Sequence, residues 1–297
     1  MRERIEQIER LLQHQTDQKE RDLAKRYASL LLVIHGVLGE FFRRYEIDGR
    51  LTYVEMVKYD RLRRMEAEII ELINSEDKAV RRDIVRHLKN QYQEAYYRVA
   101  HAIETETRTK LNYSAVRRDV LDEAINIDFT GLTLNERLER RRQELIYNMK
   151  EAIVRGLHRG KTYRQMANDI KDDLDGDLVK AQRIVRTEAH RVRELAGLKS
   201  VQHAAEQGIV MTKTWNTVED ERVRVRHSKL NGVTLPHDGV FKIDGYEAQA
   251  PGQFGAPEMD INCRCFLTYE IQDIVSKPRH DELASMSYEE WRRERLS

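Results

Sequence analysis

The chain has 297 residues, enough for about two domains. Its 52 Lys and Arg residues nearly balance 51 Asp and Glu residues, which argues against a generally basic nucleic-acid coat. Only 14 glycines and 4 prolines interrupt the sequence, and two cysteines are too few for a disulfide framework. The composition therefore favours long helices in a protein made in a reducing compartment.

The N-terminal stretch "MRERIEQIERLLQHQTDQ" is too polar for a secretory leader. The most apolar stretch, residues 30–39, is about half as long as a membrane-spanning helix. It therefore predicts a buried helix segment.

Helical periodicity dominates residues 1–130. Thr52 and Glu55 form a capping-box pattern, which predicts a helix start. Apolar residues then recur at helical spacing in two runs, which predict two successive long helices in a bundle. These runs are Leu62, Met65, Ile69 and Leu72, followed by Val80, Ile84, Leu88, Ala95, Val99 and Ile103.

Residues 131–208 contain two further capping patterns, Thr133 with Glu136 and Thr162 with Gln165. Gly160 suits the end of a helix. The motif "DLDGD" then predicts a break between a short helix, about 163–174, and a longer one, about 178–207. Such a pair resembles a helix-turn-helix, with an ordinary bundle as the alternative.

After Gly208 the chain changes character. "IVMTKTW" and "CRCFLTYEI" are β-prone, and three of the four prolines lie between them. Residues 209–272 therefore predict a small loop-rich α/β module, followed by a charged tail, 273–297, with a short helix.

Cys263 and Cys265 can present both sulfurs on one face of an extended segment. A disulfide between them would be strained, and a zinc site would need two more ligands. The candidate ligands are His227 and Asp220, then His237 and Asp260. The alternative is two small buried thiols packed in a β core.

The segment 215–232 gathers Asp220, His227 and several basic residues after a strand. A His beside a carboxylate can act as a general base, so a metal-dependent hydrolase or nuclease is one interpretation. A non-catalytic DNA-binding module is another, and a surface turn whose Asp caps a helix near residue 221 is a third. The candidate phosphate contacts are Arg222, Arg224, Arg226 and Lys229.

On the preceding helix, "RIVRTEAHRVRE" places Arg186, Glu188, Arg191 and Glu194 at helical spacing. Intrahelical ion pairs are the simplest expectation. A buried Arg–Glu link to the C-terminal module is the alternative.

In this order the motifs resemble the phage minor head proteins, the phage Mu F-like or head morphogenesis family. The resemblance covers about residues 130–270, and the N-terminal helices agree only in style. The residues that carry it are Arg186, Thr187, Glu188, Trp215, Asp220, Arg222, Arg224, His227, Leu230, Gly232, Phe241, Pro257, Asn262, Cys263, Arg264 and Cys265.

The resemblance implies a virion component inside the phage head, made in the bacterial host cytoplasm, and not an enzyme. Its expected partners are the portal protein, other capsid or scaffold proteins and double-stranded DNA, without a membrane span or a small-molecule substrate. Some relatives carry a toxin domain after this module, and none is expected here because the chain ends soon after it.

The resemblance also bears on metal. Some relatives have Cys at the positions of Arg224 and His227 and His at that of Asp260, in patterns that look like zinc sites. Arg224 cannot bind a metal. No cofactor is therefore the first expectation. Zinc held by His227, Cys263, Cys265 and Asp260 is the alternative.

The sequence thus predicts a mainly α protein, with an elongated helical body and a small α/β module. Its expected parts are a helical region that contacts the portal (1–130), the helical segment of the minor head domain (131–208), the module (209–272) and the tail (273–297).

Overall fold

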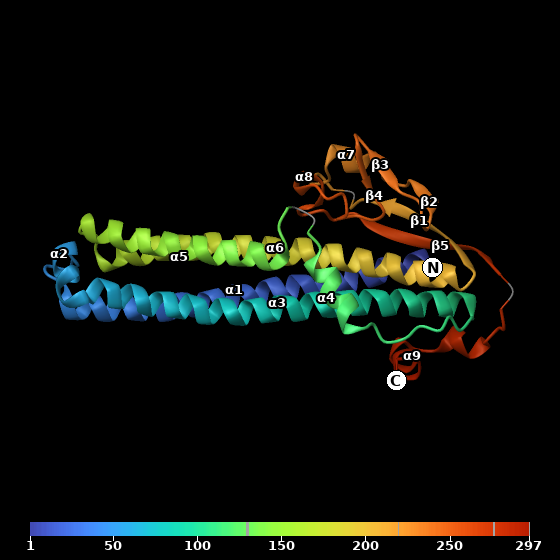
Figure 1. Ribbon diagram of the computed structural model, residues 1–297, viewed down its shortest axis with the longest axis horizontal. Coiled ribbons are helices and arrows are strands. Elements are labelled where there is room, and N and C mark those ends of the chain that lie inside the picture. Colours follow the sequence, from blue (N-terminus) through green and yellow to red (C-terminus); the bar gives the residue numbers. More distant parts are fainter. Residues whose placement is uncertain (129–130, 219, 276, 297) are drawn as a thin grey trace. The chain divides into compact units, whose positions relative to one another are not determined.

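The structure, a computed structural model, describes residues 1–128, 131–218, 220–275 and 277–296. Long helices dominate it, as Figure 1 shows, so the mainly α prediction is confirmed. The helices are α1 (Arg2–Tyr45), α2 (Tyr53–Val57), η1 (Lys58–Asp60), α3 (Arg61–Thr107), α4 (Arg118–Asn126), α5 (Leu134–His158), α6 (Tyr163–Glu206), α7 (Val225–Ser228), α8 (Pro257–Asp260), η2 (Asp281–Ser285) and α9 (Tyr288–Arg295). The strands are β1 (Ile209–Asn216), β2 (Thr234–Pro236), β3 (Phe241–Ile243), β4 (Tyr246–Ala248) and β5 (Phe266–Ile274).

The chain forms two compact units. Unit 1 comprises Met1–Asp17, Val85–Leu134 and Val185–Ser297, and unit 2 comprises Gln18–Ile84 and Asn135–Ile184. Both units are therefore built from segments far apart in the sequence.

Unit 2 is helical in its described residues. The apolar residues spaced along its helices are buried, as the periodicity predicts, with Ile34, Met65 and Ile69 fully inaccessible. Residues 30–39 lie in α1 and are only partly buried, because Leu32 and Val33 are exposed.

Two predicted helix breaks are wrong. The two apolar runs of residues 62–103 belong to one helix, α3, and the "DLDGD" motif lies inside α6. No turn separates the halves of α6, so the helix-turn-helix prediction is wrong as well.

The predicted helix starts at Thr52 and Thr162 are confirmed by their cap contacts. Thr52 accepts a hydrogen bond from the Glu55 amide at 3.3 Å, although the helix it caps, α2, has only five residues. Thr162 and Gln165 form a reciprocal box, with the Thr162 amide 2.9 Å from Oε1 of Gln165. Gly160 has φ 57°, a left-handed conformation suited to the residue after a helix.

Unit 1 contains the small module. β1 pairs antiparallel with both β2 and β5, giving the strand order β2-β1-β5, and β3 and β4 form a separate hairpin. The register of β1 against β5 runs from Ile209 opposite Ile274 to Asn216 opposite Phe266. β5 therefore begins after the cysteines, and the prediction that the strand includes "CRC" is wrong.

The tail contributes η2 and α9 to the core of unit 1, through Leu283 and Trp291. α9 begins with a capping box between Ser287 and Glu290, and Trp291 in this helix is fully buried. Within the described parts of the chain, no helix is long and apolar enough to cross a membrane.

Candidate metal centre

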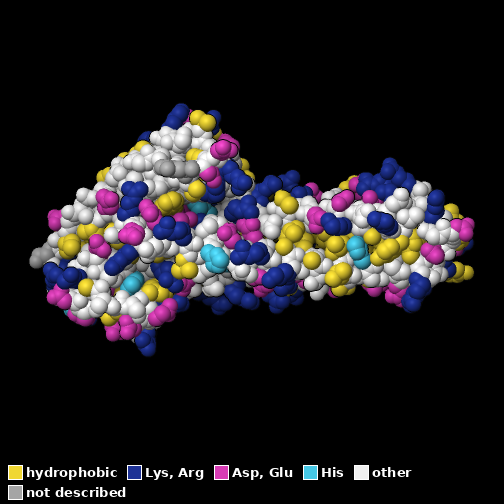
Figure 2. Space-filling view, turned by 180° about the vertical axis from the view of Figure 1, so that it is seen from behind, with side chains coloured by type: hydrophobic (Ala, Val, Ile, Leu, Met, Phe, Trp, Pro, Cys, Tyr) yellow, Lys and Arg dark blue, Asp and Glu magenta, His cyan; other side chains and the backbone are white. Residues whose placement is uncertain are grey.

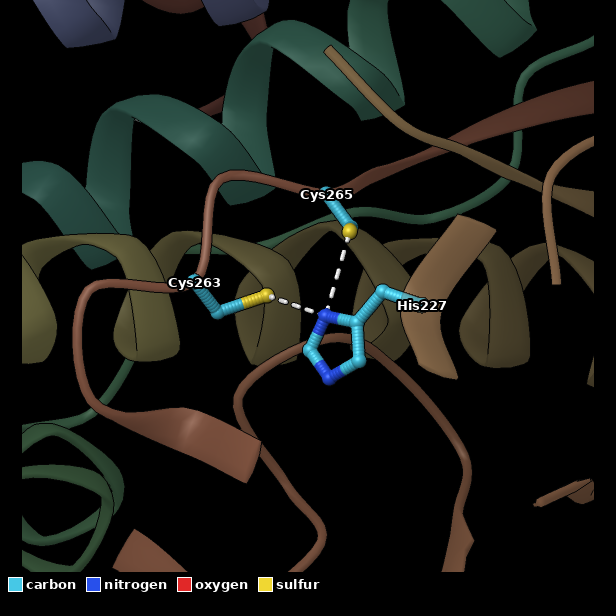
Figure 3. A group of neighbouring side chains, drawn as sticks. All are labelled: His227, Cys263 and Cys265. Atoms are coloured by element: carbon cyan, nitrogen blue, oxygen red, sulfur yellow. Dashed lines mark hydrogen bonds between the residues drawn. The ribbon is translucent and has the colours of Figure 1, made fainter. Parts of the chain in front are cut away.

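Three side chains from two separate segments converge in unit 1, as Figure 3 shows. Nδ1 of His227 lies 3.6 Å from Sγ of Cys263 and 3.4 Å from Sγ of Cys265. One ligand atom from each residue lies within 4.8 Å of the other two. All three residues are at most 3% exposed, so the group is shielded from bulk water.

The cysteines are aimed by a tight turn rather than by a strand. The Asp260 carboxylate accepts hydrogen bonds from the amides of Phe254, Gly255 and Ala256 at 2.8–3.3 Å. Asn262 then adopts φ 57°, a left-handed conformation that Asn tolerates better than most residues. The turn explains why Asn precedes Cys263 in this motif.

A row of polar side chains on α6 holds the backbone of this turn and of the start of β5. Thr187 Oγ1 accepts from the Asn262 amide at 3.2 Å, and a Glu194 carboxylate oxygen accepts from the amide of Leu267 at 3.0 Å. Between them, Nε2 of His190 lies 2.6 Å from the Cys265 carbonyl oxygen, to which it donates. Residues 187, 190 and 194 share one face of a helix, so a single stripe fixes the cysteine segment.

Glu188 and Arg191 have a different role on the same helix. They form a buried intrahelical ion pair, with Nη2 of Arg191 2.8 Å from a Glu188 oxygen, and Nη2 also donates to the Ala124 carbonyl at 2.8 Å. The expected intrahelical pair is therefore present. The helix also contacts the C-terminal module, where Glu194 accepts a hydrogen bond from the backbone of β5.

His227 lies in α7 and packs among aromatic rings. Its ring centroid is 6.0 Å from that of Trp215 and 5.8 Å from that of Phe254. Nε2 of His227 is buried and has no hydrogen-bond partner among the described residues. Beyond α7, Gly232, at φ 78°, turns the chain back so that its amide donates to the Trp215 carbonyl at 2.8 Å.

The two thiols differ in acidity. A hydrogen bond to the Cys265 sulfur, together with burial, raises the pKa of Cys263. The same hydrogen bond lowers the pKa of Cys265. Burial lowers the pKa of His190 to about 3, so this imidazole is neutral and its Nε2 donates to the Cys265 carbonyl.

The other predicted ligands lie outside the group. Asp260 is committed to its three amides, and Asp220 makes a bidentate ion pair with Arg264 at 2.5 and 2.6 Å. The arrangement that a nuclease would need, with Asp220 beside His227 and the thiols, is therefore not brought together. His237 lies after β2, and its amide donates to the Met211 carbonyl.

The predicted phosphate contacts lie on or beside α7. Nη2 of Arg224 donates to the Ile261 carbonyl, which ties it to the cysteine segment. Arg226 and Lys229 are exposed, and both lie near Asp244, at 3.4 and 3.7 Å. The Arg222 side chain is exposed, while its amide donates to Asp220.

The donor set fits a zinc-class ion at three positions. Imidazole nitrogen and thiolate sulfur are preferred zinc ligands, and the site is buried. No fourth His, Cys, Asp or Glu ligand joins the three among the described residues. The sequence analysis named the three candidate ligands but missed His190, whose only sequence signal is its helical spacing from Thr187.

Comparison with known proteins bears on the family of this chain. The family model of phage Mu protein F-like proteins matches residues 147–268, which include the polar row on α6 and the three candidate ligands. Minor head protein GP7 of Bacillus phage SPP1 is 34% identical over 299 residues, covering 98% of this chain and 97% of that protein.

A second relative is larger than this chain. It is the NAD(+)–arginine ADP-ribosyltransferase EFV of Enterococcus faecalis, which is 29% identical over 83% of this chain and 52% of its own length. No solved structure matches the chain. Because the similarity to GP7 extends over nearly the full length of both proteins, this chain belongs to the phage Mu F-like family of minor head proteins.

Proposed function

We propose that this minor head protein is carried inside the phage head, where it associates with the portal vertex and contacts the packaged DNA. The similarity to a minor head protein over nearly the whole chain carries the proposal. The structure adds two surfaces that suit the two contacts.

The first surface is the tip of unit 2, which we define as residues 43–64. Four of its side chains, Ile47, Val54, Val57 and Tyr59, are 50–81% exposed. Tyr59 and Asp60 both have φ near 55°, and two successive non-glycine residues in this conformation are costly. A group of exposed apolar side chains is typical of a protein–protein contact.

Charge indicates what kind of protein the tip contacts. Residues 43–64 contain seven Lys and Arg residues and four Asp and Glu residues, whereas the whole chain is nearly neutral. Figure 2 shows hydrophobic side chains interspersed with basic and acidic ones on one face of this unit. An acidic surface with apolar patches on the portal is the partner that complements the tip.

The second surface is the exposed edge of α7. Arg222, Arg226 and Lys229 are exposed there; Asp244 lies near Arg226 and Lys229, and Asp220 lies near Arg222. Side chains of this kind contact phosphates without reading sequence, which suits a protein that meets packaged DNA of any sequence.

Purified heads and isolated portal test the first contact. The protein should be found in heads by mass spectrometry and should bind the portal of its own phage. Val54→Ser with Tyr59→Ser should weaken portal binding about 10-fold or more, since central apolar residues carry most interface energy. Leu32→Ser, an exposed apolar residue outside the tip, is the matched control. Absence from heads together with no portal binding would overturn the proposal.

DNA binding is tested separately. The affinity for a DNA duplex of arbitrary sequence should fall with salt, and each lost phosphate contact should reduce the log–log slope by about 0.9. The triple variant Arg222→Ala, Arg226→Ala, Lys229→Ala should therefore show a shallower slope, while Lys25→Ala, an exposed residue of unit 2, should not. A slope that the triple variant leaves unchanged would remove this surface from the proposal.

A further inference from the structure

We infer that Nδ1 of His227 and the sulfurs of Cys263 and Cys265 form a binding site for a thiophilic divalent cation of the zinc class. The inference goes beyond a role in head assembly. It rests on the geometry of three buried side chains.

The distances match those of a tetrahedral zinc site. With Zn–S near 2.3 Å and Zn–N near 2.05 Å, a tetrahedral angle separates the nitrogen from each sulfur by about 3.6 Å. The structure places Nδ1 of His227 3.6 Å from one sulfur and 3.4 Å from the other. A single ion on one side of this triangle of ligand atoms would contact all three of them.

Hydrogen bonds alone satisfy the group less well. Nδ1 carries either one lone pair or one proton, so it makes one good hydrogen bond, yet two sulfurs approach it. A cation accepts all three ligands at once. When Nδ1 binds the cation, the imidazole proton stays on Nε2, which is buried and has no hydrogen-bond partner among the described residues.

Charge also fits. Two thiolates neutralise a divalent ion, so the buried centre needs no carboxylate. The thiols release their protons when the metal binds, and affinity therefore falls at low pH. Asp260 is held by three amides, so the described residues supply three ligands and Asp260 is not one of them.

The bound ion would join two segments that are far apart in the sequence. One is α7, which carries His227, and the other is the turn before β5, which carries the cysteines. The expected role is structural: the ion fixes the module around Trp215, and its loss loosens α7.

Cobalt titration of the full chain, stripped with a chelator under reducing conditions, tests the site. Cobalt(II) should bind with a stoichiometry of one per chain, giving sulfur-to-cobalt charge-transfer absorption and the strong visible bands of a tetrahedral site. Zinc should bleach both and raise the melting temperature. Cys263→Ser, Cys265→Ser and His227→Gln should each weaken binding roughly 100-fold or more, while His237→Gln, outside the group, should not.

If a variant fails to fold, the cobalt titration of the wild-type chain still tests whether the site binds a cation. Zinc should then also slow alkylation of both cysteines in the wild-type chain. No charge-transfer band and no zinc-dependent change in melting temperature would overturn the inference. Bands that persist in all three folded ligand variants would do so too. Portal and DNA binding are measured independently, so this result leaves the proposed function untouched.

Discussion

Glu104 in α3 attaches the C-terminal helix to the core of unit 1. Its carboxylate is fully buried and accepts three hydrogen bonds: from the Leu111 amide at 2.5 Å, from Nε1 of Trp291 at 2.7 Å and from Nη2 of Arg295 at 3.2 Å. Glu104→Leu removes the acceptor while keeping a good helix former. We expect it to release α9.

The magnitude follows from the donors left behind. The Leu111 amide and Trp291 Nε1 are in buried residues, and each donor left unpaired costs about 1–3 kcal/mol. Arg295 is partly exposed and can turn to water. Glu104→Leu should therefore lower the free energy of unfolding by about 2–6 kcal/mol. Glu104→Gln, which keeps one acceptor oxygen, should lose less.

A double-mutant cycle isolates the bond between Glu104 and Trp291. Trp291→Phe keeps a large ring but removes the donor. It should therefore lower the free energy of unfolding less in the Glu104→Leu variant than in the wild type, with a coupling energy of about 1–3 kcal/mol. Urea unfolding measures the free energies. Tryptophan fluorescence reports on the tail, because Trp291 is one of only two tryptophans. Additive effects, or a Glu104→Leu variant within about 0.5 kcal/mol of wild type, would refute this reasoning.

Three further changes test other parts of the fold by urea unfolding. Arg141→Leu should lower the free energy of unfolding by about 3–5 kcal/mol, because the buried carboxylates of Asp77 and Asp177 lose the cation that they share. A loss below about 1 kcal/mol would contradict this. Gly252→Ala should destabilise unit 1 by about 1–3 kcal/mol. Gly252 has φ 76°, which side chains disfavour, and an added Cβ would lie 3.4 Å from the backbone of Arg191 in α6. Unchanged stability would show that the turn adjusts. Burial lowers the pKa of Lys213 from 10.5 to about 8, so between these pH values the unfolded chain binds more protons and stability rises with pH. At pH 7 the buried ammonium of Lys213 costs about 3 kcal/mol of stability. Lys213→Met removes this cost but also the hydrogen bond to the Gln249 carbonyl, so the free energy of unfolding should rise by about 1–2 kcal/mol. This gain should disappear by about pH 10, where the lysine of the wild type is neutral in the folded chain.

Helices and strands whose apolar residues recur regularly could be predicted from the sequence. Whether two helical stretches join into one helix could not. "DLDGD" is typical of a turn because Asp and Gly disfavour helices. In the structure Asp177 accepts a hydrogen bond from Tyr27 at 2.6 Å and pairs with Arg141. These buried contacts outweigh the roughly 1 kcal/mol that Gly176 costs in a helix, so α6 continues. Local propensity carries no information about such distant partners.

The candidate site could also be predicted only in part. His227, Cys263 and Cys265 could be named from the sequence, because their side chains are of the types that bind metals and the two cysteines are closely spaced. The sequence does not reveal the shared role of Thr187, His190 and Glu194, because all three side chains bind backbone groups. Every residue has such groups, so no residue type marks the partners. In the folded chain the motifs "RTEAHR" and "NCRC" act together: Thr187 and His190 bind the Asn262 amide and the Cys265 carbonyl, and this segment directs two thiols at one imidazole.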